Sequence, residues 1–360
     1  MGASVAVRLA EAGVQATVLE AGRVGGGTSG TSFAWTNANN KPPRPYHDLN
    51  VAGMRAHAAL QEEFGSTPWW HGGGSIEWGG SDVEQAALAD KVERLRSWEY
   101  AAEWLTPRQI KTLEPDVDLA AVGGGRIAYF PEEGWLDPVP YAHAMLEAAE
   151  RAGAVIRCGA RVTAVHVNGG RVTGVTIASG DAFGADVVVN CAGRWAGEVA
   201  RMAGLQIPLA PTAGLLVFTP PVATCLRRIV RAPQCHMRPD GGGRLVLQAD
   251  DTDRQVTAAM EATPSLPQAE DLVRRASQVL PAIAGTKPEA ARIGVRPYPA
   301  DGMSAVGPMP GVSGYYVVVT HSGVTLAPFL GRAVAEELVR GRIEPLLEGF
   351  RPGRFAGQVA

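Results

Sequence analysis

The first twenty residues constrain the fold of this chain more than any other part of its sequence. Gly2 is followed at once by an amphipathic helix with a face of small residues, and Gly13 has the position of a glycine that ends a helix. Residues 14–20 then read as a strand that ends in the acidic residue Glu20. A helix and strand of this kind form the second half of a βαβ dinucleotide-binding unit.

Gly2 stands where the third glycine of a G-x-G-x-x-G motif belongs, so the first strand and the first two glycines are missing. We expect either that the true start lies upstream or that the product is damaged. Glu20 lies eighteen residues after Gly2, where an acid accepts hydrogen bonds from an adenosine ribose and disfavours a 2′-phosphate. An ordinary helix and strand ending in a solvated Glu is an equal alternative, because half of this motif is a weak signal.

Composition indicates a globular enzyme rather than a nucleic-acid or membrane protein. The chain has 360 residues, which suggests about two domains at ~150 residues each. Its net charge of −3 gives no reason to expect a nucleic-acid or anionic-membrane surface. No apolar run is long enough for a membrane span, no signal peptide is evident, and the four cysteines form no C-x-x-C pair. We therefore expect a cytoplasmic protein with reduced thiols, Cys158 and Cys191 being placed in buried strands, and no metal site.

Segments typical of parallel sheets recur at the start, the middle and the end of the chain. Residues 137–152 are predicted to form a helix that Asp137 caps and Gly153 ends, and residues 186–190 a continuously apolar, buried strand. Residues 314–319 form another such strand, followed by a helix through Arg340. The predicted fold is α/β (α+β): a Rossmann-like nucleotide domain without its first strand, and a substrate domain with a mostly antiparallel sheet. The nucleotide domain is assigned to residues 1–48, 135–205 and 290–360, and the substrate domain to 49–134 and 206–289.

Four stretches of the chain resemble the D-amino acid oxidase family of FAD-dependent oxidoreductases, which includes glycine oxidase and sarcosine oxidase. Residues 2–20 resemble the family's first helix and ribose-binding acid, and residues 25–32 resemble its glycine- and serine-rich segment around the pyrophosphate. Residues 187–193 resemble the strand and Ala-Gly turn near the cofactor. The strongest match is Gly-Val-Arg-Pro at 294–297, Asp-Gly at 301–302 and His-Ser-Gly-Val-Thr-Leu-Ala-Pro at 321–328.

The resemblance implies a set of FAD-binding residues. Backbone N–H groups at the start of the last helix would face the edge of the flavin ring that becomes negative on reduction. Thr28 and Ser29 would donate to the pyrophosphate, and Val162 would offer only its backbone to the adenine. The implied cofactor residues are Gly2, Glu20, Thr28, Ser29, Val162, Gly193, Ser322, Gly323, Val324, Thr325 and Leu326.

Arg296 is the implied substrate residue, because a guanidinium binds a carboxylate through two parallel hydrogen bonds. The resemblance places it where the family's arginine holds the substrate carboxylate; an isolated Arg before a Pro is more often at the surface. Tyr298 and His321 are the other candidate catalytic residues. Residues 37–41, which include Lys41, are interpreted first as a loop and second as polar groups of the active site.

Residues 296–301 contain no cysteine, whereas the sarcosine oxidase relatives attach flavin through a cysteine in this region, so non-covalent FAD is expected. The resemblance implies oxidation of a small amino acid or amine, hydride transfer to the flavin, and hydrolysis of the imine. The electron acceptor would be O2, a quinone or a carrier protein. The alternatives are oxidation of a 2-hydroxy acid and a truncated product that cannot bind FAD. An NAD-dependent dehydrogenase is disfavoured because the motif at 321–328 would have no role in one.

Overall fold

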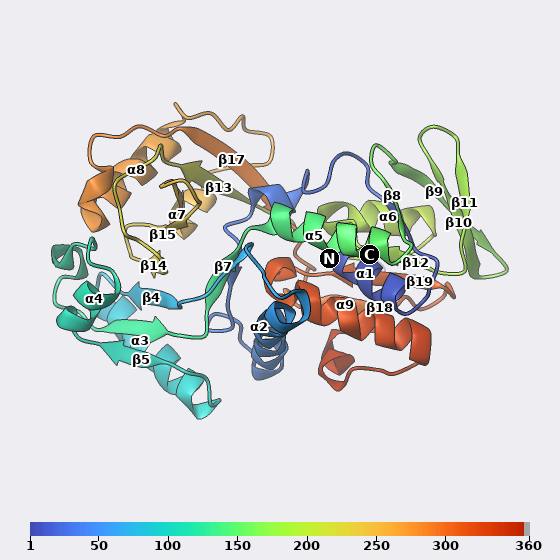
Figure 1. Cartoon of the computed structure of the whole chain (residues 1–360), viewed down its shortest axis with the longest axis horizontal. Helices are drawn as coiled ribbons and strands as arrows, with labels where there is room; N and C mark the ends of the chain where they lie inside the picture. Colours follow the sequence, from blue (N-terminus) through green and yellow to red (C-terminus); the bar gives the residue numbers. More distant parts are fainter. Residues whose placement is uncertain (356–360) are drawn as a thin grey trace.

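The structure is a computed structural model that describes residues 1–355, and it has two halves built on different sheets (Figure 1). One half holds short parallel strands together with α1 (Gly2–Glu11), α5 (Pro138–Arg151) and α9 (Gly323–Arg340). The other half holds an eight-stranded sheet, and β7 (Gly134–Leu136) runs between the two in Figure 1. None of the helices within residues 1–355 is long and apolar enough to cross a membrane.

The parallel strands come from the start, the middle and the end of the chain. β1 (Thr17–Leu19) pairs in parallel with β8 (Val155–Arg157). β12 (Val188–Asn190) pairs in parallel with β19 (Tyr315–Val319), whose other edge carries the antiparallel β18 (Ala305–Pro308). Helix α1 packs against both α5 and α9, so its small-residue face is used on two sides. The predicted mixed α/β fold is confirmed.

The two parallel ladders are not hydrogen-bonded to each other. Within the described residues, β1 pairs only with β8 and β12 only with β19, and the residues of both strands line one cavity. Two expected burials are corrected by the structure. Val187, predicted to be buried, is 40% exposed because it faces the cavity beside β12. Cys158 is exposed because it follows the last residue of β8, at the end of a strand only three residues long.

A separate antiparallel sheet covers one end of the nucleotide-binding half. It consists of β9 (Val162–Asn168), β10 (Arg171–Ile177) and β11 (Ala182–Gly184), and a turn with two glycines at 169–170 joins the first two. Helix α6 (Ala196–Met202) packs against β9. Apolar residues of these elements form one core cluster with Tyr315, so this sheet is fixed to the parallel strands by packing.

The eight-stranded sheet has the order β17-β13-β16-β15-β14-β4-β6-β5, and all its pairs are antiparallel except β14 with β4. A three-stranded sheet of order β2-β7-β3 lies beside it. The bounds of these strands are β2 (Trp35–Thr36), β3 (Trp70–His71), β4 (Ser75–Trp78), β5 (Glu103–Leu105), β6 (Ile127–Phe130), β13 (Thr212–Phe218), β14 (Ile229–Arg231), β15 (His236–Pro239), β16 (Leu245–Gln248) and β17 (Ala290–Arg296).

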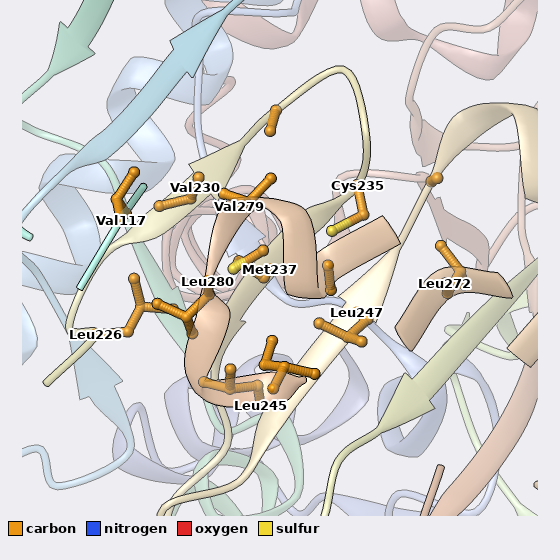
Figure 2. Packing of buried hydrophobic residues seen from close by; sticks show 14 of the residues in the cluster. Val117, Leu226, Val230, Cys235, Met237, Leu245, Leu247, Leu272, Val279 and Leu280 are labelled. Atoms are coloured by element: carbon orange, nitrogen blue, oxygen red, sulfur yellow. The ribbon is translucent and has the colours of Figure 1, made fainter. Parts of the chain in front are cut away.

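The core of this half lies between its sheet and α8 (Pro267–Val279). Apolar side chains recur at helical spacing along α8, and Leu272 and Val279 are fully buried. They pack with Met237 and Leu247 of the sheet (Figure 2). Burying a side chain of this size contributes roughly 1.5–3 kcal/mol. The position of α8 on the sheet is therefore explained by a single apolar stripe.

The remaining helices connect the sheets. Helix α2 packs against α9, although the sequence analysis assigned most of α2 to the substrate domain, and β17 lies in the large sheet although it was assigned to the nucleotide domain. The domain division itself stays a prediction. The bounds are α2 (Arg44–Phe64), α3 (Asp82–Ser97), α4 (Pro107–Leu113), α7 (Asp250–Asp253), and the 3-10 helices Thr28–Thr31, Leu119–Val122, Gly193–Trp195, Pro281–Ile283, Pro345–Phe350 and Pro352–Phe355.

Candidate active site

One continuous cavity of about 1880 Å³ joins the segments that the sequence analysis expected to converge. It runs from the acidic end of β1 past the first turn of α1 and the start of α9, and it reaches Pro297 and His321. Small-molecule pockets usually hold ~300–1,000 Å³. This one is larger because it includes the opening between β1 and β12.

Two helices begin at this cavity. Met1, Gly2 and Ala3 at the start of α1 line it, and so do Gly323 and Val324 at the start of α9. The first N–H groups of a helix have no partner within the helix and carry its positive end. A cavity flanked by two such ends favours a ligand with negative charge at two places.

The start of α9 is held by side chains from other elements. Pro328 lies inside the helix and has no N–H, so the carbonyl of Val324 lacks its usual helical donor. The Nε2–H of buried His57, on α2, donates to this carbonyl at 2.9 Å. Burial lowers the pKa of His57 to about 4, so its ring is neutral at pH 7. The hydroxyl of Thr325 donates to the carbonyl of Trp35 at 3.4 Å. The cavity end of α9 therefore has a fixed position.

Most of the predicted cofactor residues meet at the cavity. Glu20 lines one end of it, and one of its carboxylate oxygens accepts the N–H of Gly22 at 2.8 Å. The hydroxyl of Thr28 donates to the carbonyl of Val295 at 2.6 Å, so its proton is already engaged. The predicted residues that line the cavity are Gly2, Glu20, Thr28, Ser29, Val162, Gly193, His321, Gly323 and Val324, while Ser322, Thr325 and Leu326 are buried behind it.

The three candidate catalytic residues lie together near the end of the cavity. The ring of Tyr298 stacks on that of His321, with centroids 4.2 Å apart and planes at 19°. Arg296 ends β17, and its guanidinium forms an ion pair with Asp253 of α7. The Arg296 side chain is 35% exposed, whereas that of Asp253 is 8% exposed. Arg296 is thus oriented by a buried carboxylate, and only part of its five-donor fork is used.

His321 is also contacted by two residues that the sequence analysis did not select. Its Nε2 lies 3.3 Å from Nζ of Lys41, and its Nδ1 lies 3.2 Å from the hydroxyl of Tyr46. Burial and the nearby cations Lys41 and Arg296 lower the pKa of His321 well below its ordinary value. Burial also lowers the pKa of Lys41 to about 7, opposed by Glu133. At neutral pH the imidazole is therefore uncharged, and Lys41 gives up its proton far more readily than an ordinary lysine.

A second buried group, Glu133, organises the floor of this region. Its carboxylate accepts hydrogen bonds from Ser75, Tyr100, Trp35 Nε1 and both the backbone and side-chain N–H groups of Asn39, at 2.6–3.2 Å. Burial raises the pKa of Glu133 to about 7 despite these donors. The guanidinium of Arg231 lies over the ring of Trp35, with its central carbon 4.7 Å from the ring centroid. The loop that carries Asn39 and Lys41 is therefore anchored beside His321.

The residues missed by sequence reasoning share one property, which is that distant parts of the chain bring them together. Tyr46 and His57 occupy α2, where the helical pattern indicates only packing. Glu133 precedes β7 with no motif around it. Lys41 carried a weak signal, since it lies nine residues after the glycine- and serine-rich segment at 25–32 that the resemblance places against the cofactor. Its position in the loop was recognised, but its role was ranked second.

The comparisons with known proteins agree with this geometry. Residues 1–337 match the family model DAO, described as FAD dependent oxidoreductase. The chain is 26% identical over 372 aligned positions to glycine oxidase from Geobacillus kaustophilus, which covers 100% of this chain and 96% of that protein. It is also 27% identical to hydrogen cyanide synthase subunit HcnC from Pseudomonas protegens, over 70% of this chain and 60% of that protein.

Solved structures show the same fold. The crystal structure of glycine oxidase from Geobacillus kaustophilus superposes with a TM-score of 0.86 at 24% identity, over 98% of this chain and 95% of that one. L-proline dehydrogenase from P. horikoshii gives a TM-score of 0.84 at 20% identity, over 98% and 94%. The family model matches nearly the whole chain, and the start, the middle and the end of the chain meet at one cavity. This protein is therefore a member of the DAO family of FAD-dependent oxidoreductases.

Proposed function

We propose that this chain binds FAD non-covalently and oxidises a small amino acid or amine, with preference for one that carries a carboxylate. The observation that carries the proposal is the continuous cavity, which links an acid suited to a ribose, two helix N-termini and the Arg296–Tyr298–His321 cluster. Glycine oxidase, the relative named above, acts on an amino acid by its name. When bound, FAD supplies the acceptor for a hydride equivalent.

The residues present fit this cofactor. Glu20 has one carboxylate oxygen held by Gly22 and would offer the other to the ribose hydroxyls. The first turn of α1 would face the pyrophosphate, where the free N–H groups of the helix start favour negative charge. The first turn of α9 would donate to the flavin edge that gains negative charge. No cysteine occurs between Arg296 and Asp301, which supports a non-covalent cofactor.

The substrate carboxylate would bind the donors of Arg296 that Asp253 leaves free, which fixes its direction because Asp253 already orients the guanidinium. Tyr298 would form the wall between this carboxylate and His321, since its ring lies flat on the imidazole. The nearby buried Trp and Tyr side chains would exclude water from the reacting carbon. The imine product would be hydrolysed after release.

The test is a spectrum followed by a substrate panel. The purified protein should show flavin absorbance, and acid precipitation should leave a colourless pellet with the flavin in the supernatant. Glycine, sarcosine, D-amino acids, L-proline and 2-hydroxy acids should then be compared by hydrogen peroxide and ammonia release, with an artificial electron acceptor in parallel. Ammonia from a primary amino acid supports the proposal. Turnover of 2-hydroxy acids alone would replace it with the hydroxy-acid alternative, and a protein that never takes up FAD would refute it.

A further inference from the structure

We propose that Lys41 accepts a proton from the substrate ammonium group, and that His321, Tyr46 and Ser322 form a hydrogen-bonded series that rearranges to accommodate the charge that Lys41 gains. This inference rests on the proposed function, because it assigns a proton acceptor to amine oxidation. Lys41 lies in the loop between β2 and α2, and Tyr46 lies in the first turn of α2. Ser322 is the N-cap residue of α9.

The contacts form an unbroken series. Nζ of Lys41 is 3.3 Å from Nε2 of His321, and Nδ1 of His321 is 3.2 Å from the hydroxyl of Tyr46. That hydroxyl is 2.7 Å from the hydroxyl of Ser322. The N–H of Ser322 donates to the hydroxyl of Thr320 at 3.0 Å, and Thr320 also accepts a hydrogen bond from Ser304 at 2.8 Å. Except for His321, these residues are buried.

The series has two complementary arrangements. A protonated Lys41 has only donors, so it must donate to Nε2 of His321, and the Nδ1–H of a neutral ring then donates to Tyr46. A neutral Lys41 has a lone pair and accepts from Nε2–H, while Nδ1 accepts from Tyr46. The tautomer of His321 therefore follows the protonation of Lys41. Because both arrangements satisfy the ring nitrogens, the series can switch from one to the other when Lys41 gains a proton, without leaving either nitrogen unpaired.

The charges around Lys41 explain why it suits this role. Among the described residues no carboxylate lies within 4.0 Å of its nitrogen, whereas Arg296 and Arg231 are paired with acids of their own. A buried ammonium without a carboxylate partner is costly, and burial lowers the pKa of Lys41 to about 7. The groups that face Lys41 are Glu133, which favours its charged form, Arg231 and Arg296, which disfavour it, and His321, with Tyr46 and Tyr298 on either side of that ring.

The chemical step needs this acceptor. An amino acid enters with an –NH3⁺ group, and its nitrogen must lose one proton to regain the electron pair that forms the C=N bond. Lys41 takes this N–H proton and becomes an ammonium, while the nitrogen keeps the electron pair. The hydride equivalent removed from the neighbouring carbon is the part of the reaction that the family's FAD accounts for. One proton and one hydride thus leave the substrate, which gives a protonated imine.

The first test compares pH profiles of kcat/KM for the FAD-loaded wild type, Lys41→Met and Lys41→Arg, with exposed Lys287→Met as the matched control. In the wild type we expect kcat/KM to fall tenfold per pH unit below about pH 7, the pKa of Lys41. In both Lys41 variants the pH below which kcat/KM falls should rise toward the pKa of the free substrate amine. At pH 7 kcat/KM should drop by about 10²-fold or more and recover at high pH, in line with loss of a general base.

Lys41→Arg separates proton transfer from charge, because a guanidinium keeps the positive charge but cannot accept a proton at these pH values. If Lys41 served only to bind an anion, Lys41→Arg would keep the wild-type pH profile of kcat/KM. Lys41→Met would then raise KM without changing the pH at which kcat/KM begins to fall. That result would overturn the proposal. Lys41→Arg also covers the case in which Lys41→Met does not fold.

The second test is independent of activity. The chain has four lysines, Lys41, Lys91, Lys111 and Lys287, so protein labelled with [13Cε]lysine gives few NMR signals. The signal that is missing in Lys41→Arg should titrate near pH 7, and Tyr46→Phe should shift its midpoint. A midpoint near the ordinary lysine value would overturn the proposal. If the wild type oxidises no amine at all, the proposed function fails, whereas this titration still reports on Lys41.

Discussion

Replacing Arg296 by Met should remove the preference for a carboxylate and leave the rest of the site in place. Two parallel charge-assisted hydrogen bonds to a substrate would contribute ~1.5–3 kcal/mol each in isolation. Because Asp253 already contacts part of the guanidinium, we take about 3 kcal/mol as the total for the two hydrogen bonds to the substrate. At ~1.4 kcal/mol per factor of ten, kcat/KM for glycine should fall by about 10²-fold. Arg296→Lys should keep the positive charge but not the two parallel donors, so its kcat/KM for glycine should fall roughly tenfold.

Comparison with a substrate that lacks the carboxylate separates the loss of carboxylate binding from any effect of the mutation on stability. Asp253 keeps two donors after the change, the N–H of Leu215 at 2.9 Å and Nε2 of Gln248 at 2.8 Å, so the fold should lose only about 1 kcal/mol. Anaerobic stopped-flow bleaching of the flavin should be measured with glycine and with methylamine, which lacks the carboxylate. The variant should lose glycine oxidation and keep whatever methylamine oxidation the wild type has. Equal losses for both amines, or no loss for glycine, would refute carboxylate binding by Arg296.

Three further outcomes follow from the structure. FAD at a hundred times its Kd should stabilise the folded protein by ~2.7 kcal/mol and raise Tm in differential scanning fluorimetry, and NAD should not; an equal shift with NAD would contradict the flavin assignment. The pKa of His57 is lowered to about 4, below its unfolded value of ~6.5, so its contribution to stability is full above pH 6.5 and is lost as pH falls toward 4. Between pH 7.5 and 5, urea unfolding should show the wild type losing ~2 kcal/mol more than His57→Gln, and parallel curves would refute this. Gly294→Ala should cost ~1–3 kcal/mol, because its Cβ would clash with the backbone carbonyl oxygen of Thr31, whereas Gly349→Ala, with nothing within 4 Å, should be neutral in the same measurement.

Much of the fold could be predicted because its signals are local. The helix over 137–152 appears as Pro138–Arg151 with Gly153 at φ +95° beyond it, and the last helix ends at Arg340 as expected. These elements depend on periodicity and on end signals that neighbouring residues supply. One local signal misled, since the Asp137 side chain makes no capping bond. It faces His71 at 3.0 Å instead, because β3 and β7 bring the two residues together.

The site was predictable only in part, because its motifs describe the cofactor side and not the opposite wall. The segments at 2–20, 187–193 and 321–328 converge on the cavity as the resemblance implies. The opposite wall depends on pairs that are far apart in sequence, such as Lys41 with His321 and Arg296 with Asp253. No periodicity or spacing encodes such pairs. They follow from how the large sheet and α2 pack against the end of the cavity.

Ser322 links these two sides of the site physically. It is the N-cap residue of α9, so its backbone sets where the N–H groups that face the cavity begin. Its hydroxyl also contacts that of Tyr46, which places it three contacts away from Lys41. A change that moves the start of α9 must therefore alter both the N–H donors toward the cofactor and the hydrogen-bonded series from Ser322 to Lys41. This coupling explains why a short His-Ser-Gly segment is packed among Tyr46, Tyr298 and Thr320, and it predicts that Ser322→Ala will shift the Lys41 titration and weaken FAD binding together. An effect on only one of the two would show that they are independent.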